Sequence, residues 1–395
     1  MKNRYLALLI LVPLLLGCNK PADKPDDKQD PDPKEQVDPA TPSDPAPEED
    51  DLAPQVKDGD VILVTNEKVE KFLTDVTYPE NDYTTTHILD EAYAPTAPGN
   101  SDRPQEFTIR WTADKSAGDP VARLWEDDGW SREYTNLDAE DYYLTITNLR
   151  PNANYHFEVK AGSKTLTSGS FKTTGHVHQL TFKSRVRNVR DLGGWKTKDG
   201  SKTVKYRKIY RGGRMQSSTL TTSGIRDVLA EGIRAQLDLR GKSDVLTEPA
   251  IAEMDFCAPV IEEGYKYLLQ SDNAKLKQCF DFILKCVREN KPVYFHCSLG
   301  RDRTGTISMV VLGILGVNEG DISKEYELTQ FAPHGWATSD GEKTKMTRKA
   351  DYDDAAKYIW EFANGGEFAD GMQNYLLSIG VTQAEIDEFR SLMLE

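Results

Sequence analysis

The sequence is poor in positive charge, in histidine and in long apolar runs. Its 395 residues hold 49 Lys and Arg against 64 Asp and Glu, which gives a formal net charge of −15. A protein that binds a nucleic-acid backbone needs a basic face, so this balance argues against nucleic acid as a partner. The six histidines and five cysteines form no cluster with metal-ligand spacing. We therefore predict no metal and no other cofactor.

The apolar run near the N-terminus covers only residues 6–16, too short to span a bilayer as a helix. Lys2 and Arg4 precede it, and Gly17 and Cys18 follow it. This stretch, residues 1–18, resembles the signal of a bacterial lipoprotein, with an ordinary secretory signal as the alternative. The resemblance implies export, lipidation of Cys18, and anchoring to the membrane of the cell envelope, at the outer membrane or the cell surface.

Residues 19–56 are rich in proline and acidic residues and almost free of large apolar side chains. Such a segment cannot bury enough surface to offset the entropy of ordering, so it predicts a disordered acidic linker.

Residues 57–175 predict a β-sandwich, because short runs of alternating polarity are separated by turn residues. The runs begin near residues 61, 107, 121, 143, 155 and 170. Residues 149–155, which read LRPNANY, resemble the stretch of fibronectin type III domains that carries the tyrosine corner. The resemblance implies a fibronectin III-like spacer or binding module, whose partner would be a protein or a glycan.

Residues 176–395 alternate strand and helix patterns, which predicts an α/β domain with a mostly parallel central sheet flanked by helices. Predicted strands end near Leu239 and His296, and an apolar helix follows over residues 303–315. Cys279 and Cys286 stand seven residues apart on another predicted helix, which favours two core thiols over a disulfide.

The loop between the second of these strands and the apolar helix covers residues 296–305 and reads HCSLGRDRTG. The backbone N–H groups between Cys297 and Arg303 can point at a phosphoryl group, and the helix N-terminus adds partial positive charge. The same field favours thiolate over thiol, and the planar guanidinium of Arg303 can hold two phosphoryl oxygens. The pattern predicts that Cys297 attacks phosphorus and forms a covalent phosphocysteine.

These residues resemble the protein-tyrosine-phosphatase superfamily, and more narrowly the bacterial tyrosine and dual-specificity phosphatases whose loop reads His-Cys-x-x-Gly-Lys-Asp-Arg-Thr-Gly. Residues 188–194, 209–213 and 237–240 are similar to three further motifs of that family. The resemblance implies hydrolysis of phosphotyrosine, and of other phosphoesters where specificity is dual, in a phosphorylated protein.

Two aspartates are candidates for the general acid that protonates the leaving group. Asp302 matches the loop aspartate to which the resembled family assigns this role. Asp238, at a predicted strand end, is the second candidate, with a structural role beside Arg240 as its alternative. We expect Thr304 to donate a hydrogen bond to the departing thiolate and His296 to orient the loop.

The other loop positions are expected to bind the phosphoryl group: Ser298, Leu299, Gly300, Arg301 and Gly305. Arg301 replaces a lysine that in the resembled family accompanies activity on phosphoinositides. A phosphoinositide or inositol-phosphate phosphatase therefore stays open, as does a surface binding protein with an inactive phosphatase domain. His334 and Trp336 are candidates for the mouth of the site, with a plain surface loop as the alternative.

Overall fold

The computed structural model describes residues 52–78, 101–332 and 348–395, and Leu52–Glu395 form one compact unit. The predicted signal with Cys18, the predicted linker up to residue 51, and His334 and Trp336 lie outside the described residues. Of the helices in the described ranges, none has both the length and the apolar character needed to cross a membrane.

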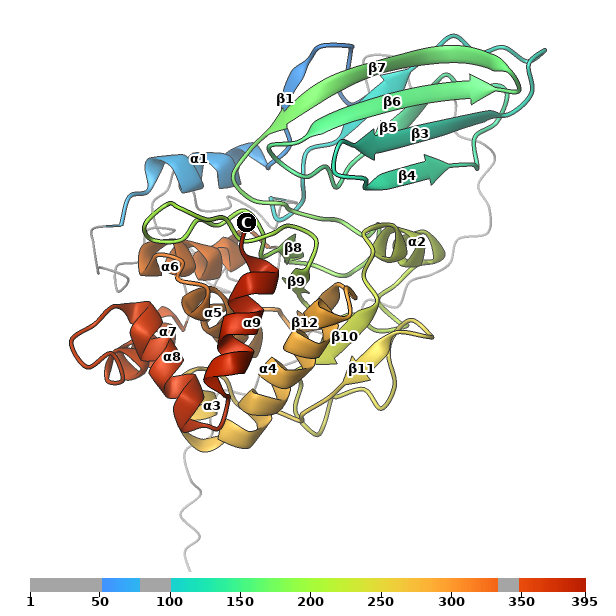
Figure 1. Cartoon of the computed structure of the whole chain (residues 1–395). Coiled ribbons are helices and arrows are strands. Elements are labelled where there is room, and N and C mark those ends of the chain that lie inside the picture. Colours follow the sequence, from blue (N-terminus) through green and yellow to red (C-terminus); the bar gives the residue numbers. More distant parts are fainter. Residues whose placement is uncertain (1–51, 79–100, 333–347) are drawn as a thin grey trace, which may run out of the picture. The chain divides into compact units, whose positions relative to one another are not determined.

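The N-terminal part of the described chain is built from two β-sheets (Figure 1). Their strands are β1 (Val61–Leu63), β2 (Phe107–Arg110), β3 (Pro120–Glu126), β4 (Ser131–Tyr134), β5 (Tyr143–Ile146), β6 (Asn154–Ala161) and β7 (Lys164–Thr174). The larger sheet has the order β1-β7-β6-β3-β4, and β2 pairs with β5. Ile109 and Ile146 from the small sheet share one core with Leu124 and Phe157 from the large one. The two sheets therefore pack face to face.

Helix α1 (Glu67–Asp75) was not expected in this part of the chain. Asn66 caps it by accepting a hydrogen bond from the Lys68 N–H at 3.0 Å. Val69, Phe72 and Leu73 lie on one face of the helix, and they pack into the hydrophobic core of the C-terminal part. The helix is short and stands between strands, so the two-residue alternation read from its neighbours does not reveal it.

The C-terminal part contains a five-stranded sheet in the order β11-β10-β12-β9-β8. Its strands are β8 (Arg190–Asp191), β9 (Ile209–Gly212), β10 (Ala235–Asp238), β11 (Asp255–Cys257) and β12 (Val293–His296). Four of them run parallel, but β8 pairs with β9 in the antiparallel sense. The sheet is therefore mixed, which corrects the prediction of a mostly parallel sheet. No helical crossover separates β8 from β9, so the chain returns beside itself in the antiparallel direction.

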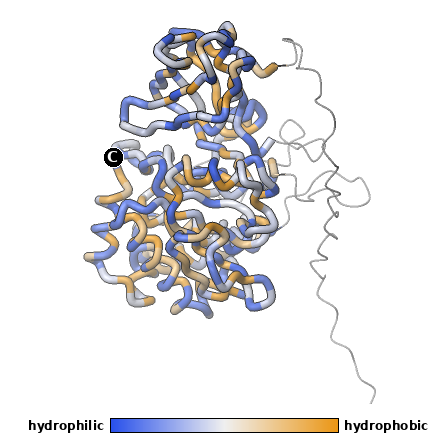
Figure 2. Tube along the Cα trace, turned by 90° about the vertical axis from the view of Figure 1, so that its right-hand side faces the viewer, coloured by the Kyte–Doolittle hydropathy of each residue, from blue (hydrophilic) through white to orange (hydrophobic). Residues whose placement is uncertain are grey.

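Helices cover both faces of this sheet, because its strands are apolar on both sides. Val293 and Phe295 of β12 face one core, and Tyr294 faces the other. Helix α2 (Thr222–Ala230) packs on the Tyr294 side. The Phe295 side is covered by α3 (Tyr265–Ser271), α4 (Asn273–Arg288), α5 (Asp302–Ile314), α6 (Glu319–Glu327), α7 (Lys349–Trp360), α8 (Phe368–Ser378) and α9 (Gln383–Met393). Figure 2 shows hydrophobic and hydrophilic residues interspersed along the trace, as expected of elements with one buried and one exposed side.

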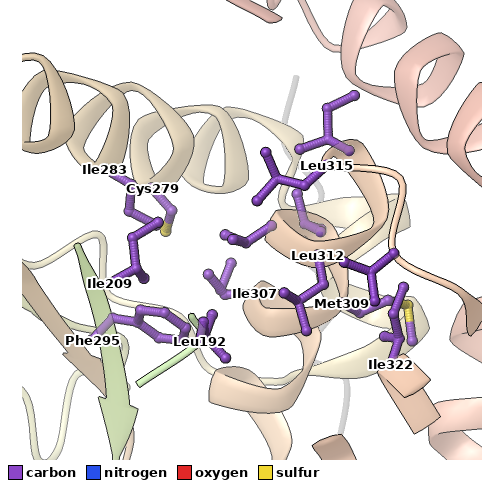
Figure 3. Close-up of a cluster of buried hydrophobic side chains, with 14 of the residues drawn as sticks. Leu192, Ile209, Cys279, Ile283, Phe295, Ile307, Met309, Leu312, Leu315 and Ile322 are labelled. Carbon is purple, nitrogen blue, oxygen red and sulfur yellow. The ribbon is translucent and has the colours of Figure 1, made fainter. Parts of the chain in front are cut away.

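Helix α5 is apolar around most of its circumference, and every residue from Thr304 to Ile314 is buried. A helix of this kind belongs in the interior of a domain. Ile307 lies on the side of Leu192 and Phe295, whereas Met309 lies beside Ile322 of α6 (Figure 3). All five belong to one core with Cys279 of α4. Cys286 of α4 is buried in the same core. The core thus fixes α5, and with it the loop at the N-terminus of α5.

Polar contacts join the β-rich part to the C-terminal part within the compact unit. Arg207 donates to the buried carboxylate of Glu126 at 2.5 Å, and Arg150 donates to the same carboxylate at 2.9 Å. The Asn148 side-chain amide donates to the Thr181 carbonyl at 2.8 Å. A buried carboxylate needs such partners to remain charged.

Candidate active site

Residues 297–301 form the loop between β12 and α5, and its carbonyl groups are held by the surrounding structure. The Cys297 carbonyl accepts from His296 Nδ1 at 3.1 Å, and the Ser298 carbonyl accepts from the Arg214 N–H at 3.0 Å. Asn188 donates through Nδ2 to the carbonyls of Leu299 and Gly300, at 3.2 and 3.1 Å. The carbonyls of four successive loop residues therefore accept hydrogen bonds from groups on the outer side of the loop.

The N–H groups of Ser298, Leu299 and Gly300 donate to no acceptor among the described residues. Helix α5 also begins without a side-chain cap, since Arg301 at its N-cap forms no capping hydrogen bond. Free N–H groups beside an uncapped helix N-terminus make a binding site for an anion. We refer to this segment, from Cys297 to Arg303, below as the cradle (residues 297–303).

A buried ion cluster fixes the outer side of the cradle. Arg211 donates through NH1 to both carboxylate oxygens of Glu325 at 2.8 Å, and its NH2 donates to the Gly300 carbonyl. Arg190 donates to the same carboxylate at 2.8 Å. Burial alone would raise the pKa of Glu325, but the two guanidinium groups outweigh burial and hold the pKa below its ordinary range.

Two constraints favour glycine at position 300, namely its backbone conformation and the lack of room for a side chain. Its φ is +73°, in the left-handed region that residues with a side chain rarely adopt. A Cβ at this position would lie 2.4 Å from the backbone carbon of Gly212, so the neighbouring strand end leaves no room for it. The glycine thus lets the cradle turn directly against β9.

The Cys297 side chain lies at the base of the cradle, and the residue is 2% exposed. Burial alone would raise the pKa of its thiol, since burial disfavours a charge. The charge of Arg303 and the polar groups of Thr304 act in the opposite sense and prevail, so the pKa lies below its ordinary value. The Thr304 hydroxyl is buried without a hydrogen-bond partner among the described residues, so its proton is available to the sulfur.

His296 is fully buried under the cradle and is neutral at physiological pH. Burial lowers the pKa of its imidazole to about 4, and the nearby charge of Arg240 acts in the same sense. The Gln236 amide donates to Nε2 at 2.8 Å, so the proton of the neutral ring lies on Nδ1, which donates to the Cys297 carbonyl. The ring is therefore placed to orient the loop, and not to exchange protons with it.

Arg303 stands at the first turn of α5 and is half-buried. Its NH1 donates to the Ile261 carbonyl at 3.0 Å, which orients the guanidinium from one side. Gly264 packs against the backbone N of Arg303, where a Cβ would lie 2.9 Å away. The segment from Ile261 to Gly264 thus borders the end of the cradle. Gly305 contacts the ring of Tyr326 from inside the helix.

Asp302 is paired with its neighbour Arg301. The Arg301 guanidinium donates to both carboxylate oxygens, and the Tyr265 hydroxyl donates to Oδ1. Burial alone would raise the pKa of Asp302, but Arg301 and Tyr265 prevail and the pKa is lowered. The Arg301 side chain is only 10% exposed, so in this structure it serves the carboxylate and does not extend as a separate cation for substrate.

Asp238 is fully buried at the end of β10, and its oxygens already accept several hydrogen bonds. Arg240 donates to both oxygens at 2.8–3.2 Å, and the N–H groups of Arg240 and Leu246 add bonds at 3.0 and 2.9 Å. Burial would raise the pKa of this carboxyl, but the hydrogen bonds from Arg240 and from the Leu246 N–H hold it below its ordinary value. Arg240 also donates to Gln216 at 2.8 Å. The geometry favours the structural alternative for Asp238.

Sequence reasoning did not assign the residues that hold the cradle from outside, namely Asn188, Arg190, Arg211 and Glu325. A signal was present, since Arg190 and Arg211 stand in the two family-like motifs at residues 188–194 and 209–213. A buried guanidinium requires a carboxylate partner, which points to an acidic residue on a covering helix. Glu325 is far from both arginines in the sequence, so the sequence does not show which acidic residue is their partner. In the described residues no group of three His, Cys, Asp or Glu side chains is arranged to hold a metal ion.

The C-terminal part matches the sequence profile of the tyrosine phosphatase family over residues 182–395, more than half of the chain. The chain belongs to the tyrosine phosphatase family.

Two curated relatives are named as tyrosine-protein phosphatases. The protein of Cupriavidus necator is 24% identical over 173 residues, which cover 38% of this chain and 62% of the relative. The protein of Nostoc commune is 26% identical over 141 residues, which cover 32% of this chain and 47% of the relative. The chain thus spans less than two thirds of the length of either relative. A crystal structure of a mutant Tk-PTP covers 38% of this chain and 92% of its own at 16% identity, with a TM-score of 0.25, too low for a structural inference.

The lowered pKa of Cys297 predicts selective alkylation of this thiol. Burial raises the pKa of Cys257 and Cys279, and that of Cys286 to about 12. Iodoacetamide at pH 7 should therefore modify Cys297 well before the other three, as followed by peptide mass spectrometry. Arg303→Gln removes the positive charge that favours thiolate, so the pH midpoint of Cys297 alkylation should rise. An unchanged midpoint in this variant would contradict the electrostatic account.

Proposed function

We propose that the chain is a cysteine-dependent phosphomonoesterase that hydrolyses phosphotyrosine, with phosphoserine and phosphothreonine as further substrates if its specificity is dual. The observation that carries this proposal is the construction of the cradle. Its carbonyls are bound on the outer side, its N–H groups are free, and the thiol of Cys297 at its base has a lowered pKa. Such a site stabilises the equatorial oxygens of a phosphoryl group in transfer.

In the first step, the Cys297 thiolate attacks phosphorus, an S–P bond forms, and the P–O bond to the tyrosine oxygen breaks. Arg303 and the N–H groups of the cradle hold the non-bridging oxygens. The leaving phenolate takes its proton from Asp302, which becomes a carboxylate.

In the second step, water attacks phosphorus and the S–P bond breaks, which releases inorganic phosphate. Asp302 takes the proton that the attacking water loses, and this restores the acid. The Thr304 hydroxyl donates to the departing Cys297 thiolate, which stabilises it as a leaving group. His296, neutral and bonded to the Cys297 carbonyl, keeps the loop in place throughout.

Asp302 suits the role of general acid better than Asp238 does. Asp302 stands in the cradle and is partly exposed, whereas Asp238 is fully buried and bound by Arg240 and by two backbone N–H groups. The acid must reach the leaving oxygen, and Asp238 would have to give up these bonds to do so.

Neither alternative function gains a specific observation. Activity on phosphoinositides would be helped by a second cation at the cradle, but Arg301 is bound to Asp302. An inactive binding protein has no need for a thiol whose pKa is lowered by a neighbouring arginine.

We also propose that the two-sheet part is a fibronectin type III-like sandwich, within residues 57–175, that spaces the enzyme or binds a protein or glycan. In support, the Tyr155 hydroxyl accepts the Arg150 N–H five residues upstream at 2.8 Å, the bond expected of a tyrosine corner. An experimental structure in which the strands pair in another order would contradict this proposal.

Turnover by the protein starting after Cys18 tests the phosphatase proposal. Under reducing conditions, it should release phosphate from a phosphotyrosine peptide faster than from a phosphoserine peptide, a phosphoinositide or inositol hexakisphosphate. Cys297→Ser should abolish release, because the hydroxyl is a far poorer nucleophile. Cys286→Ser, on a buried thiol away from the cradle, is the matched control. Turnover that survives in Cys297→Ser, or none on any substrate, would refute the mechanism.

Leaving groups of different basicity test Asp302. Asp302→Asn should lower kcat on phenyl phosphate by about 10²–10⁴-fold, since the phenolate then leaves without a proton. The loss should be much smaller on p-nitrophenyl phosphate, whose leaving group needs little help. Because the pKa of Asp302 is lowered in the free site, little of the protonated acid is present at neutral pH, so wild-type kcat/KM on phenyl phosphate should be highest at acidic pH. Equal losses on both substrates would exclude Asp302, and the same contrast in Asp238→Asn would assign the role to Asp238.

We propose in addition that Cys18 carries lipid and anchors the protein to the bacterial cell envelope, at the outer membrane or the cell surface. The apolar run over residues 6–16 and the Gly17-Cys18 junction support this proposal. The full chain expressed in a Gram-negative bacterium should incorporate labelled palmitate and fractionate with membranes. Cys18→Ser should lose the label, and label retained in that variant would contradict the proposal.

A further inference from the structure

The peptide unit between Arg187 and Asn188 is held on both of its sides. Its carbonyl accepts a hydrogen bond from the Gly213 N–H at 2.8 Å, and its N–H donates to Asp102 Oδ2 at 2.8 Å. Asn188 and Asp102 are both buried. A hydrogen bond to a carboxylate is stronger than one between neutral groups. The orientation of this peptide unit is therefore fixed by Asp102 from one side and by the residue after β9 from the other.

Asn188 carries this orientation to the cradle. Its φ is +59°, in the left-handed region that asparagine enters more readily than most residues with a side chain. Its Nδ2 donates to the carbonyls of Leu299 and Gly300, and its Oδ1 accepts from Arg190. A turn of the peptide unit before Asn188 changes φ, and with it the direction in which the side chain leaves the backbone. Asp102 thus acts on the carbonyls of the cradle through a single residue.

Asp102 stands in the segment that leads into β2, and this segment is itself anchored. The Ser101 carbonyl accepts from Gln179 Nε2 at 3.0 Å, and Gln179 Oε1 accepts the Asn66 N–H at 2.8 Å. Asn66 is the N-cap of α1, whose apolar face packs into the C-terminal core. Contacts therefore run from the start of α1 through Gln179 to Asp102.

This support of the cradle comes from outside the part of the chain that matches the family profile. The profile covers residues 182–395, whereas Asp102 and Gln179 precede it. Asp102 also lies 3.7 Å from Arg187 NH1, so its charge has a second neighbour. The bond to the Asn188 N–H is much shorter, which makes it the contact through which the carboxylate fixes the backbone.

We propose that Asp102 is a positioning residue for the cradle, so that the β-rich part completes the active site. Asp102 holds the peptide unit before Asn188, and Asn188 holds two carbonyls of the cradle outward, which directs the N–H groups of the loop inward. The inference rests on the proposed function of the cradle and deepens it. Asp102 acts through Asn188 and takes no part in the chemistry.

Turnover and the binding of tungstate, an oxyanion that resembles phosphate, test this inference. Asp102→Ala should weaken tungstate binding in isothermal titration calorimetry and lower kcat about 10- to 100-fold, since a misplacement of about 1 Å can cost about 100-fold. The loss should be equal on phenyl phosphate and p-nitrophenyl phosphate, because the cradle is affected and the general acid is not. Asp102→Asn keeps an oxygen that can accept the Asn188 N–H, so it should recover most of the loss. No recovery would assign the effect to the charge that faces Arg187 and would overturn the inference.

Asp227→Ala is the matched control for the removal of a buried aspartate. Asp227 of α2 accepts from Arg132 of β4, so it also joins the β-rich part to the C-terminal part. Its loss should lower the melting temperature but leave kcat and tungstate affinity at wild-type values. The same loss of affinity in Asp227→Ala as in Asp102→Ala would show a general effect of the contact between the two parts and overturn the inference.

A second variant decides the question if Asp102→Ala does not fold. Gln179→Leu removes the anchor of the segment that carries Asp102, and it should weaken tungstate binding in the same way but to a smaller extent. Wild-type tungstate affinity in folded Asp102→Ala, or in Gln179→Leu where that variant is needed, would overturn the inference. Weaker tungstate binding in these variants, with no turnover by the wild type, would reject the phosphatase proposal and support this one.

Discussion

The site depends on one constraint, the outward fixing of the carbonyl groups between Cys297 and Arg301. A peptide unit presents its carbonyl and its N–H on opposite sides, so a carbonyl bound outside leaves an N–H for the inside. Asn188 alone binds two of these carbonyls, and Arg211 shares the second with it. The N–H groups are therefore directed before any substrate arrives, and little reorganisation remains for the reaction.

This constraint is maintained by charges that are themselves buried. Glu325 on α6 joins Arg190 of β8 to Arg211 of β9, and Arg211 reaches the cradle. Removal of one partner from such a cluster leaves an uncompensated charge, with a typical loss of about 3–5 kcal/mol. The same cluster accounts for the short antiparallel strand β8. Its two residues, Arg190 and Asp191, serve to place side chains, and they add little to the hydrogen bonding of the sheet.

Local patterns predicted much of the fold, including β10, β12, α5 and the strands of the β-rich part that alternate in polarity. The order HCSLGRDRTG predicted a loop of this kind because the pattern is local, with cysteine, glycine and arginine within ten residues. Features that depend on distant partners were not accessible. Nothing near residue 70 tells that α1 packs into the C-terminal core, and nothing near residue 325 tells that Glu325 supports the cradle. Asp238 illustrates the same limit, since its place at a strand end was predicted, but the number of donors around it was not.

In the proposed mechanism, the pairing of Arg301 with Asp302 lets the protonation of Asp302 change when substrate binds. In the free site Arg301 and Tyr265 stabilise the carboxylate, which opposes its use as an acid. A phosphoryl dianion in the cradle adds negative charge close to Asp302 and competes with it for the guanidinium of Arg301. Both effects raise the pKa of a carboxyl group, because like charge and the loss of a cation each favour the neutral form. Substrate binding would thus protonate the acid at the moment when a leaving group is present. An arginine at position 301 suits this proposed coupling, since a guanidinium can hold two oxygens at once, whether of the carboxylate or of the phosphoryl group.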